Sequence, residues 1–371
     1  MTSIKNNKPD IRIGVVGATG VVGETFLLLL EERGFPFSDL RLFASDASKG
    51  LKRTVDQREF QVTTLTEGCF DGLDIVFFSS GDDISKEWAP RAVKSGAVAI
   101  DNSGAFRMDS KITLAVPEIN ADLLPSLTPG ERPGSKAQII ANPNCSTIQL
   151  VVALKPLSDR YGIESVKVSS YQSVSGAGKA GLEELLEQTK LAVEGEIPQK
   201  GTTFPKAIAF DSIPQIGSFV TDGSDDDGFC SEEIKIMKET RKIMRLPDVK
   251  VSAFTVRVPT LNSHAETVWV TLKKPAKSLA EIESVMADGE GLEIFGRTLK
   301  PGTKGAAPAS KGATDYPTQA FASGEDPVYV GRIHKDPSDE TTWMMWVVSD
   351  NLRKGAALNG IQIAEAMFHL K

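Results

Sequence analysis

A short apolar segment followed by three spaced glycines and a helical pattern constrains the fold of this chain most strongly. Residues 11–16 are rich in β-branched side chains, Gly17, Gly20 and Gly23 follow, and apolar residues then recur at helical spacing up to about Gly34. Strand, glycine turn and helix in this order open a nucleotide-binding βαβ unit, because glycine lets the backbone approach a pyrophosphate at the helix N-terminus. A plain tight turn is the alternative, but the position directly after the first strand favours the nucleotide site.

Strand and helix patterns alternate through the rest of the first third of the chain. Strands are expected at residues 40–45, 74–80 and 97–101, with a helix at residues 85–95. This alternation predicts an α/β fold with a parallel, doubly wound sheet of the Rossmann type. Ligands bind such sheets beyond the carboxyl ends of the strands, so the residues that follow each strand are candidate binding residues.

After residue 142 the pattern becomes that of an α+β domain with a mainly antiparallel sheet. Residues 166–174 alternate as a half-buried strand, and residues 249–258 and 265–272 are expected to pair as a hairpin. A helix is expected to begin at Ser231, with this serine as its cap, and a long closing helix spans residues 354–370.

The chain length predicts two domains, because 371 residues are more than one hydrophobic core usually serves. The closing helix is expected to return and pack on the first domain. The expected division therefore assigns residues 1–141 plus 354–371 to a dinucleotide-binding domain and residues 142–353 to the second domain.

Charge and hydropathy limit the partners of the chain. Its net charge is −7 and no block of Lys or Arg occurs, which argues against nucleic acid and anionic membranes as partners. No apolar run approaches the roughly 18 residues of a membrane span, and the N-terminal residues lack the apolar core of a signal peptide. A small-molecule substrate and a cytoplasmic location are therefore expected.

The cysteines indicate a reducing compartment. There are three, Cys69, Cys145 and Cys230, without a CxxC pair or a His/Cys cluster. This pattern predicts neither a disulfide framework nor a metal site. Cys69 and Cys230 lack any special context and are interpreted as structural.

Cys145 carries the clearest chemical signal. Residues 139–141 predict the end of a buried strand, Asn142-Pro143-Asn144 interrupts it, and a helical pattern follows. Cys145 therefore falls in the first turn of a helix, where unpaired backbone N–H groups and the helix dipole favour a nucleophilic thiolate. A small buried core cysteine is the alternative, but the strand–Asn-Pro-Asn–helix context favours a nucleophile.

Three polar residues are candidate partners of Cys145. His264 has the pKa suited to relaying protons, although a histidine in a surface loop is an equal alternative. Arg257, on the same expected hairpin, is suited to gripping a carboxylate, and a strand-edge salt bridge is its common alternative. Gln172 lies in a half-buried strand, where its amide must be satisfied or face a site.

Three further residues are candidates for the site: one follows a strand and two lie at the start of a helix. Arg107 comes after the strand at residues 97–101 and is placed to reach the ligand-binding edge, although a solvated loop arginine is as compatible. Glu232 and Lys235 share a helix face, which an ordinary surface pair also explains. A cofactor fold with a Cys/His pair and several anion-binding groups points to oxidation or reduction of an acyl group held as a thioester, with hydride exchanged with a nicotinamide.

Seven stretches of the chain match one known family, and they are specific as a set. They are residues 17–23 (Gly-Ala-Thr-Gly-Val-Val-Gly), 101–107 (Asp-Asn-Ser-Gly-Ala-Phe-Arg), 142–147 (Asn-Pro-Asn-Cys-Ser-Thr), Gln172 with 175–178, 232–235, Arg257 with His264, and 350–359. Through them the chain resembles the aspartate-β-semialdehyde dehydrogenases over nearly its full length.

The resemblance implies an oxidoreductase that converts L-aspartyl-4-phosphate into L-aspartate 4-semialdehyde by reductive dephosphorylation, with NADP. It places the reaction in the aspartate-derived biosynthesis of lysine (through diaminopimelate), threonine, methionine and isoleucine. It also implies that the second domain is catalytic and carries the dimer contact, and that the working form is a homodimer or homotetramer.

The resemblance assigns a role to each candidate residue. Cys145 would attack the acyl phosphate, His264 would be the acid/base and Gln172 would orient the intermediate, while Arg257 would hold the substrate carboxylate and Glu232 its amino group. The phosphate pocket is assigned to three polar residues, namely Arg107, Lys235 and Asn144. The cofactor is assigned to two glycine turns and neighbouring strand ends, namely Gly17, Thr19, Gly20, Val21, Val22, Ser45, Ser48, Ser80, Ser175, Gly176 and Asn351.

One departure from the family bears on the cofactor. Many bacterial members have an arginine for the 2′-phosphate of NADP just after the second strand, where this chain has Ala47 beside Asp46. Ser45, Ser48 and Lys49 are still suited to bind a phosphate. NADP is therefore predicted, and use of NAD stays open.

Two related enzymes and one non-enzyme are the alternatives. N-acetyl-γ-glutamyl-phosphate reductase performs the same chemistry on a substrate one methylene longer, but its cysteine motif usually reads Gly-Cys-Tyr, whereas this chain reads Asn144-Cys145-Ser146. Glyceraldehyde-phosphate dehydrogenase fails at the same motif. A nucleotide-sensing protein without activity is expected to have lost Cys145, His264 or Arg257, and all three are present.

Overall fold

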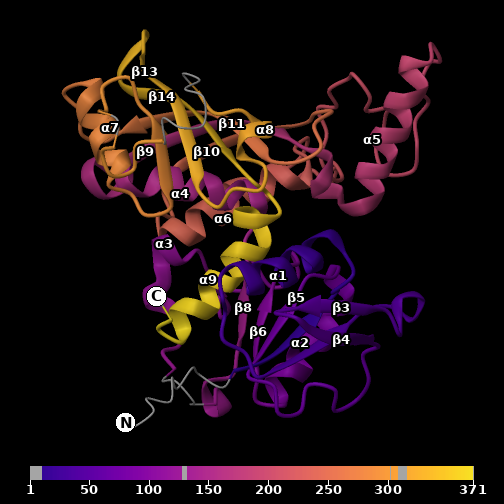
Figure 1. Ribbon diagram of the computed structural model, residues 1–371. Helices are drawn as coiled ribbons and strands as arrows, with labels where there is room; N and C mark the ends of the chain where they lie inside the picture. Colours follow the sequence, from indigo (N-terminus) through magenta and orange to yellow (C-terminus); the bar gives the residue numbers. More distant parts are fainter. Residues whose placement is uncertain (1–10, 128–131, 301, 308–315, 371) are drawn as a thin grey trace. The chain divides into compact units, whose positions relative to one another are not determined.

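The chain divides into two compact units, which can be followed by residue colour in Figure 1. The computed structural model describes residues 11–127, 132–300, 302–307 and 316–370. The first unit is Met1–Pro143 with Ala356–Lys371, and the second is Asn144–Gly355. The two junctions lie two residues beyond the domain boundaries expected from the sequence. Within the described ranges, no helix has the length and apolarity needed to cross a membrane.

The first unit is built on an eight-stranded sheet in the order β3-β4-β2-β1-β5-β6-β8-β7. Its strands are β1 Arg12–Val16, β2 Asp39–Phe43, β3 Lys52–Val55, β4 Arg58–Thr63, β5 Ile75–Phe78, β6 Val98–Asp101, β7 Thr113–Leu114 and β8 Ile139–Ala141. All neighbours pair in parallel except β3 and β4, which are antiparallel at one edge. The predicted parallel, doubly wound sheet is confirmed.

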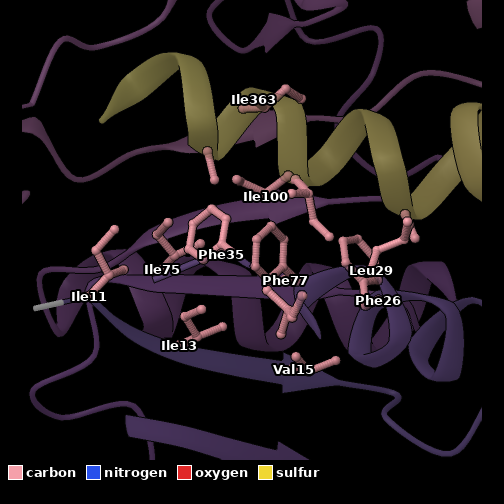
Figure 2. Close-up of a cluster of buried hydrophobic side chains, with 14 of the residues drawn as sticks. Ile11, Ile13, Val15, Phe26, Leu29, Phe35, Ile75, Phe77, Ile100 and Ile363 are labelled. Atoms are coloured by element: carbon pink, nitrogen blue, oxygen red, sulfur yellow. The ribbon is translucent and has the colours of Figure 1, made fainter. Parts of the chain in front are cut away.

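Helices cover both faces of this first sheet. They are α1 Val21–Glu32, α2 Asp82–Lys94, the short α3 Pro117–Asn120 and α9 Leu358–Met367. On one face, shown in Figure 2, Phe26 of α1 and Ile363 of α9 join Phe77 of β5 in one buried cluster. On the other face, α2 packs through Ala89 and Ala92. The closing helix thus belongs to the core of the first unit, as the sequence predicted.

The second unit contains a six-stranded sheet in the order β10-β9-β11-β14-β13-β12. Its strands are β9 Ile163–Gln172, β10 Lys250–Arg257, β11 His264–Leu272, β12 Leu292–Phe295, β13 Val328–Asp336 and β14 Asp339–Ser349. β9 with β11, β11 with β14 and β14 with β13 are antiparallel, whereas β10 with β9 and β12 with β13 are parallel. The sheet is therefore mixed and mainly antiparallel, as predicted.

Two helices lie against one face of the second sheet and position the candidate site. The helices of this unit are α4 Cys145–Tyr161, α5 Gly178–Val193, α6 Ser231–Met244, α7 Leu279–Ala287 and α8 Gln319–Ala322. α4 packs on β9, β11 and β14, while α6 packs on β10 and on α4. α4 is buried from Ser146 to Leu154 and again at Leu157 and Tyr161, so it forms the centre of this unit.

Three local predictions are wrong. β10 and β11 do not form a hairpin, because β9 lies between them, parallel to β10 and antiparallel to β11. Residues 258–263 therefore cross the end of β9 instead of making a tight turn. α6 is capped by Cys230 and not by Ser231, and the backbone N–H of Cys230 donates to Glu233 Oε2 at 2.9 Å. A π-helical turn, Arg353–Ala357, precedes α9, so the closing helix is shorter than expected.

Candidate active site

Cys145 is the first residue of α4, as the sequence predicted. Asn144 caps this helix, and its Oδ1 accepts hydrogen bonds from the backbone N–H groups of Ser146 at 3.0 Å and Thr147 at 3.2 Å. The sequence predicted unpaired backbone N–H groups at this helix start, but the asparagine side chain satisfies these two. Cys145 is half-buried and forms no disulfide.

The cap itself is fixed by two carboxylates of α6. Asn144 donates from Nδ2 to Glu232 Oε1 and from its backbone N to Glu239 Oε2, both at 2.7 Å. All three residues are buried. Buried hydrogen bonds to charged acceptors are short and strong. They tie the start of α4, and with it Cys145, to α6.

Glu232 is a buried anion and not a member of a surface pair. Its Oε2 accepts from Lys235 Nζ at 3.2 Å. Burial alone would raise the pKa of Glu232, but the charges of Lys235 and Arg257 and the hydrogen bond from Asn144 outweigh it, so the pKa is lowered. The alternative of an ordinary solvated pair is therefore wrong for Glu232.

One row of cross-strand neighbours brings three predicted residues together. Arg257 at the end of β10 pairs with Gln172 at the end of β9, and Gln172 pairs with His264 at the start of β11. Neighbours in one row place their side chains on the same face of a sheet. Gln172 Nε2 donates to Ser146 Oγ at 2.7 Å, which links this row to the residue that follows Cys145.

His264 is the first residue of a strand and is completely buried, so the surface-loop interpretation is wrong. Its Nδ1 accepts the backbone N–H of Ser173 at 3.1 Å. Because a backbone amide only donates, the neutral ring carries its proton on Nε2. Nε2 is buried and has no hydrogen-bond partner among the described residues. Burial, followed by the charge of Arg257, lowers the pKa of His264 to about 3.

We expect His264 to destabilise the protein in acid. The unfolded chain binds a proton at this residue near pH 6.5 and the folded chain only near pH 3, so the free energy of unfolding falls as the pH drops between these values. Between pH 7 and pH 5, the free energy of unfolding should fall by about 2 kcal/mol more for wild type than for His264→Gln. Urea denaturation at both pH values measures it. His334→Gln, at a partly exposed histidine of β13, is the control, and equal losses in wild type and His264→Gln would contradict the assignment.

Arg257 supplies the positive charge of this cluster. It is buried, and its Nη1 donates to the backbone oxygen of Ser173 at 2.6 Å. Burial lowers the pKa of its guanidinium, and the charges of Glu232 and Cys145 oppose this. A Cβ on Gly176 would lie 3.1 Å from Arg257 Nη1 and 3.2 Å from His264 Nε2, so a side chain at this position would crowd both buried groups.

Ser175 and Asn351, both predicted to approach the nicotinamide, lie in contact. Asn351 Nδ2 donates to Ser175 Oγ at 3.0 Å, and Ser173 Oγ donates to Asn351 Oδ1 at 3.1 Å. Ser173 also contacts His264 Nδ1. The predicted cofactor residues of the second unit are thus joined to the histidine through one serine.

The glycine turn of the first unit fits a pyrophosphate. Gly17 has φ +84°, and a Cβ there would lie 2.8 Å from the carbonyl oxygen of Ser79, while a Cβ on Gly23 would lie 2.1 Å from Gly17 O. These two glycines are therefore required by the turn and by the packing of α1 on β1. Gly20, at the N-cap of α1, is exposed and meets only Gly17 O at 3.4 Å, which leaves its backbone open to a ligand.

The other predicted cofactor residues of this unit surround the same strand ends. Thr19 Oγ1 lies 3.2 Å from Ser48 Oγ. Val21 and Val22 open α1, Ser45 precedes the 3₁₀ turn Asp46–Ser48, and Ala47 and Lys49 are exposed. Ser80 follows β5, and its buried hydroxyl has no hydrogen-bond partner within the described part of the chain.

Arg107 lies in the loop after β6 and is buried, so it is not a solvated loop arginine. Its Nη2 donates to Asn102 O at 2.8 Å. Asp101 organises the loop, accepting from Ser103 Oγ and Ser85 Oγ at 2.7 Å each. Burial raises the pKa of Asp101, although these hydrogen bonds oppose it.

Three site residues were missed from the sequence. Ser173 follows Gln172 directly, and Glu239 lies seven residues after Glu232 on the same face of α6, which was a usable signal. Gly355 is required because a Cβ there would lie 2.8 Å from Cys145 Cβ. Glu266 of β11, which no contact connects with these residues among the described hydrogen bonds, is fully buried beside Gln149, and burial raises the pKa of its carboxyl well above the ordinary value.

Comparisons with known proteins place both units in one family. The semialdehyde dehydrogenase NAD binding domain matches residues 12–126, and the semialdehyde dehydrogenase dimerisation domain matches residues 154–354. Aspartate-semialdehyde dehydrogenases of Aquifex aeolicus and Bacillus subtilis are 44% and 42% identical, each over 96% of this chain and 97% of their own length. A crystal structure of aspartate semialdehyde dehydrogenase II from Vibrio cholerae, complexed with ASA, superposes with a TM-score of 0.85 at 39% identity, covering 97% of this chain and 98% of that chain.

Proposed function

Since the chain belongs to the aspartate-semialdehyde dehydrogenase family of oxidoreductases, we propose that it reduces L-aspartyl-4-phosphate to L-aspartate 4-semialdehyde with NADP, through a thioester on Cys145. The product would feed the aspartate-derived pathway to lysine, threonine, methionine and isoleucine. One observation carries the proposal most directly. Ser146, the residue after Cys145, accepts a hydrogen bond from Gln172, and Gln172 is the cross-strand neighbour of both Arg257 and His264.

Thioester formation is the first step. Cys145 Sγ attacks the acyl carbon of the substrate, and the bond from that carbon to the phosphate oxygen breaks, so that inorganic phosphate leaves. The charge of Arg257 acts on Cys145 and favours its thiolate. Gln172 Nε2, on the adjacent sheet face, is assigned to orient the acyl group.

Reduction of the thioester is the second step. The nicotinamide, when bound, supplies a hydride in this direction and accepts it in reverse. The thiohemiacetal oxyanion formed on Cys145 then collapses, the C–S bond breaks, and the aldehyde is released with the thiolate restored. His264 is suited to donate a hydrogen bond from Nε2 to this oxyanion, because its ring is neutral with the proton on that atom.

Substrate recognition is assigned to the charged residues that the sequence predicted for it. Arg257 would bind the substrate α-carboxylate, and the buried anion Glu232 its ammonium group. Lys235 and Arg107 would bind phosphate. Asn144 Nδ2 carries two hydrogens and donates one to Glu232, which leaves the other for the phosphate.

The cofactor and the assembly complete the proposal. The first unit matches the model of an NAD binding domain. The open backbone at Gly20 and the Ser80 hydroxyl, which has no hydrogen-bond partner among the residues that the structure describes, support a bound pyridine nucleotide. We assign the 2′-phosphate of NADP to Ser45 and Ser48. We also propose a homodimer or homotetramer, because the second unit matches a dimerisation domain.

Initial rates test the function and the cofactor together. The reverse reaction, with L-aspartate 4-semialdehyde, phosphate and either NADP or NAD, should reduce the nicotinamide only when phosphate is present, and faster with NADP. Ala47→Arg should raise the NADP preference, because a cation beside the ribose favours the 2′-phosphate. If the wild-type protein shows no activity with this aldehyde but oxidises N-acetylglutamate semialdehyde, it is instead an N-acetyl-γ-glutamyl-phosphate reductase. If the protein binds the cofactor but turns over neither aldehyde, it is a nucleotide-sensing protein without activity.

A further inference from the structure

Gln319, the first residue of α8, joins three backbone or side-chain oxygens of the second unit. Its Nε2 donates to Tyr171 O at 3.1 Å, to Thr260 Oγ1 at 3.1 Å and to Ser263 O at 2.8 Å. An amide nitrogen has two hydrogens, so at least one of them is shared between two acceptors. The side chain therefore connects the end of β9 with both halves of the loop that leads into β11.

The loop in question, residues 258–263, is the crossover that replaces the expected hairpin. Val258 N donates to Gln172 O at 3.0 Å, and Thr260 O accepts from Val174 N at 2.9 Å. The crossover thus pairs with the strand end on which Gln172 and Ser173 lie. The crossover ends directly before His264, whose Nδ1 accepts a hydrogen bond from the backbone N–H of Ser173.

The last residue of the crossover has a strained backbone. Ser263 is buried and has φ +68°, in the left-handed region that non-glycine residues rarely adopt. Such a conformation persists only where surrounding contacts hold it. The shortest of the three Gln319 hydrogen bonds ends on the carbonyl oxygen of Ser263, the residue that immediately precedes His264.

We propose that Gln319 is a positioning residue for His264: its amide holds the crossover on the end of β9 and so fixes His264 with Nδ1 on Ser173 and Nε2 turned to the substrate. The inference rests on the proposed function of His264. Gln319 does not touch substrate in this scheme, and it acts through Ser263.

Gln319→Leu tests the proposal, because leucine keeps much of the volume and removes both donors. We expect kcat to fall about 10- to 100-fold, the scale of a small misplacement of a reacting group. The KM values for the aldehyde and for phosphate, and the rate of Cys145 alkylation by iodoacetamide, should stay within about twofold, because Arg257 and Cys145 have their own supports. A general structural role would instead change all of these together.

Two further variants sharpen the test. Ser263→Gly removes the cost of the left-handed conformation, so it should restore part of the lost kcat in the Gln319→Leu background. Gln188→Leu is the matched control: Gln188 is a buried glutamine of α5 whose Nε2 donates to Gln199 O and whose Oε1 accepts from Ile208 N. It should lower the melting temperature and leave kcat unchanged.

The outcomes separate this inference from the proposed function. If wild type shows no phosphate-dependent turnover, the proposed function fails. If wild type is active and folded Gln319→Leu retains kcat within twofold, or gains nothing from Ser263→Gly, the positioning role is wrong. If Gln319→Leu does not fold, Thr260→Val replaces it, because this substitution removes one of the three acceptors of Gln319. We expect kcat of Thr260→Val to fall about two- to fivefold. An unchanged kcat would equally contradict the positioning role.

Discussion

Cys145→Ser is expected to abolish the phosphate-dependent reduction of NADP by L-aspartate 4-semialdehyde, with a loss in kcat of at least about 10⁴-fold. A serine hydroxyl is not ionised near neutral pH, and the positive charge of Arg257 favours a thiolate but cannot accept a proton from an alcohol. His264 is a poor base here, because burial and Arg257 hold its pKa at about 3. Initial rates with both proteins at equal concentration measure the effect.

Cys230→Ser is the control for this experiment. Cys230 is buried, and its Sγ lies 3.2 Å from Thr255 Oγ1, a contact that a serine can keep. This variant should retain wild-type kcat, whereas Cys145→Ser should still bind the nicotinamide cofactor. Residual turnover above a few per cent in Cys145→Ser would remove Cys145 from the role of nucleophile.

Arg257→Met is expected to have the second largest effect, a loss of roughly 10²- to 10³-fold in kcat/KM. The substitution removes the proposed carboxylate ligand and leaves the buried anion Glu232 with one fewer compensating charge. It also removes one cause of the low pKa of His264, so that pKa should rise. Steady-state kinetics measure the first effect, and an NMR titration of the histidine ring measures the second.

The matched substitution is Arg332→Met on β13, where the arginine is exposed. It should change neither kcat/KM nor the titration of His264. A fall in kcat/KM for Arg257→Met without a change in the KM for the aldehyde would contradict carboxylate binding and leave only an electrostatic role.

The sequence predicted local structure wherever the information was local. The position of Cys145 at the start of α4 follows from a strand, an Asn-Pro-Asn break and an apolar helix within ten residues. The glycine turn before α1 follows in the same way, because Gly17 and Gly23 are demanded by contacts with residues close by or in the next strand. These patterns carried the fold of the first unit.

Strand pairing could not be predicted in the same way. Alternation indicates that residues 249–258 and 265–272 are strands, but it does not say that β9, about eighty residues earlier in the chain, enters between them. This insertion is what sets Gln172 between Arg257 and His264. The hairpin prediction placed the same two residues near each other for the wrong reason.

The spacing of charged residues in the sequence also could not show which of them are buried. Glu232 and Lys235, three residues apart, match an exposed pair, and only the contact of α6 with α4 makes Glu232 a buried partner of Asn144. The neutral state of His264 likewise depends on complete burial beside Arg257, which lies on another strand. Such features arise from tertiary packing.

The place of α9 in the first unit has a consequence for biosynthesis. The apolar face formed by β1, β5 and α1 is completed by Ile363 and its neighbours, yet 212 residues of the second unit are made between Pro143 and Ala356. At roughly 5–20 residues per second, the nascent first unit would wait some tens of seconds with that face uncovered. Its folding is therefore expected to finish only after translation passes residue 367, and the growing chain is the stage at which this protein is most exposed to aggregation and to chaperones.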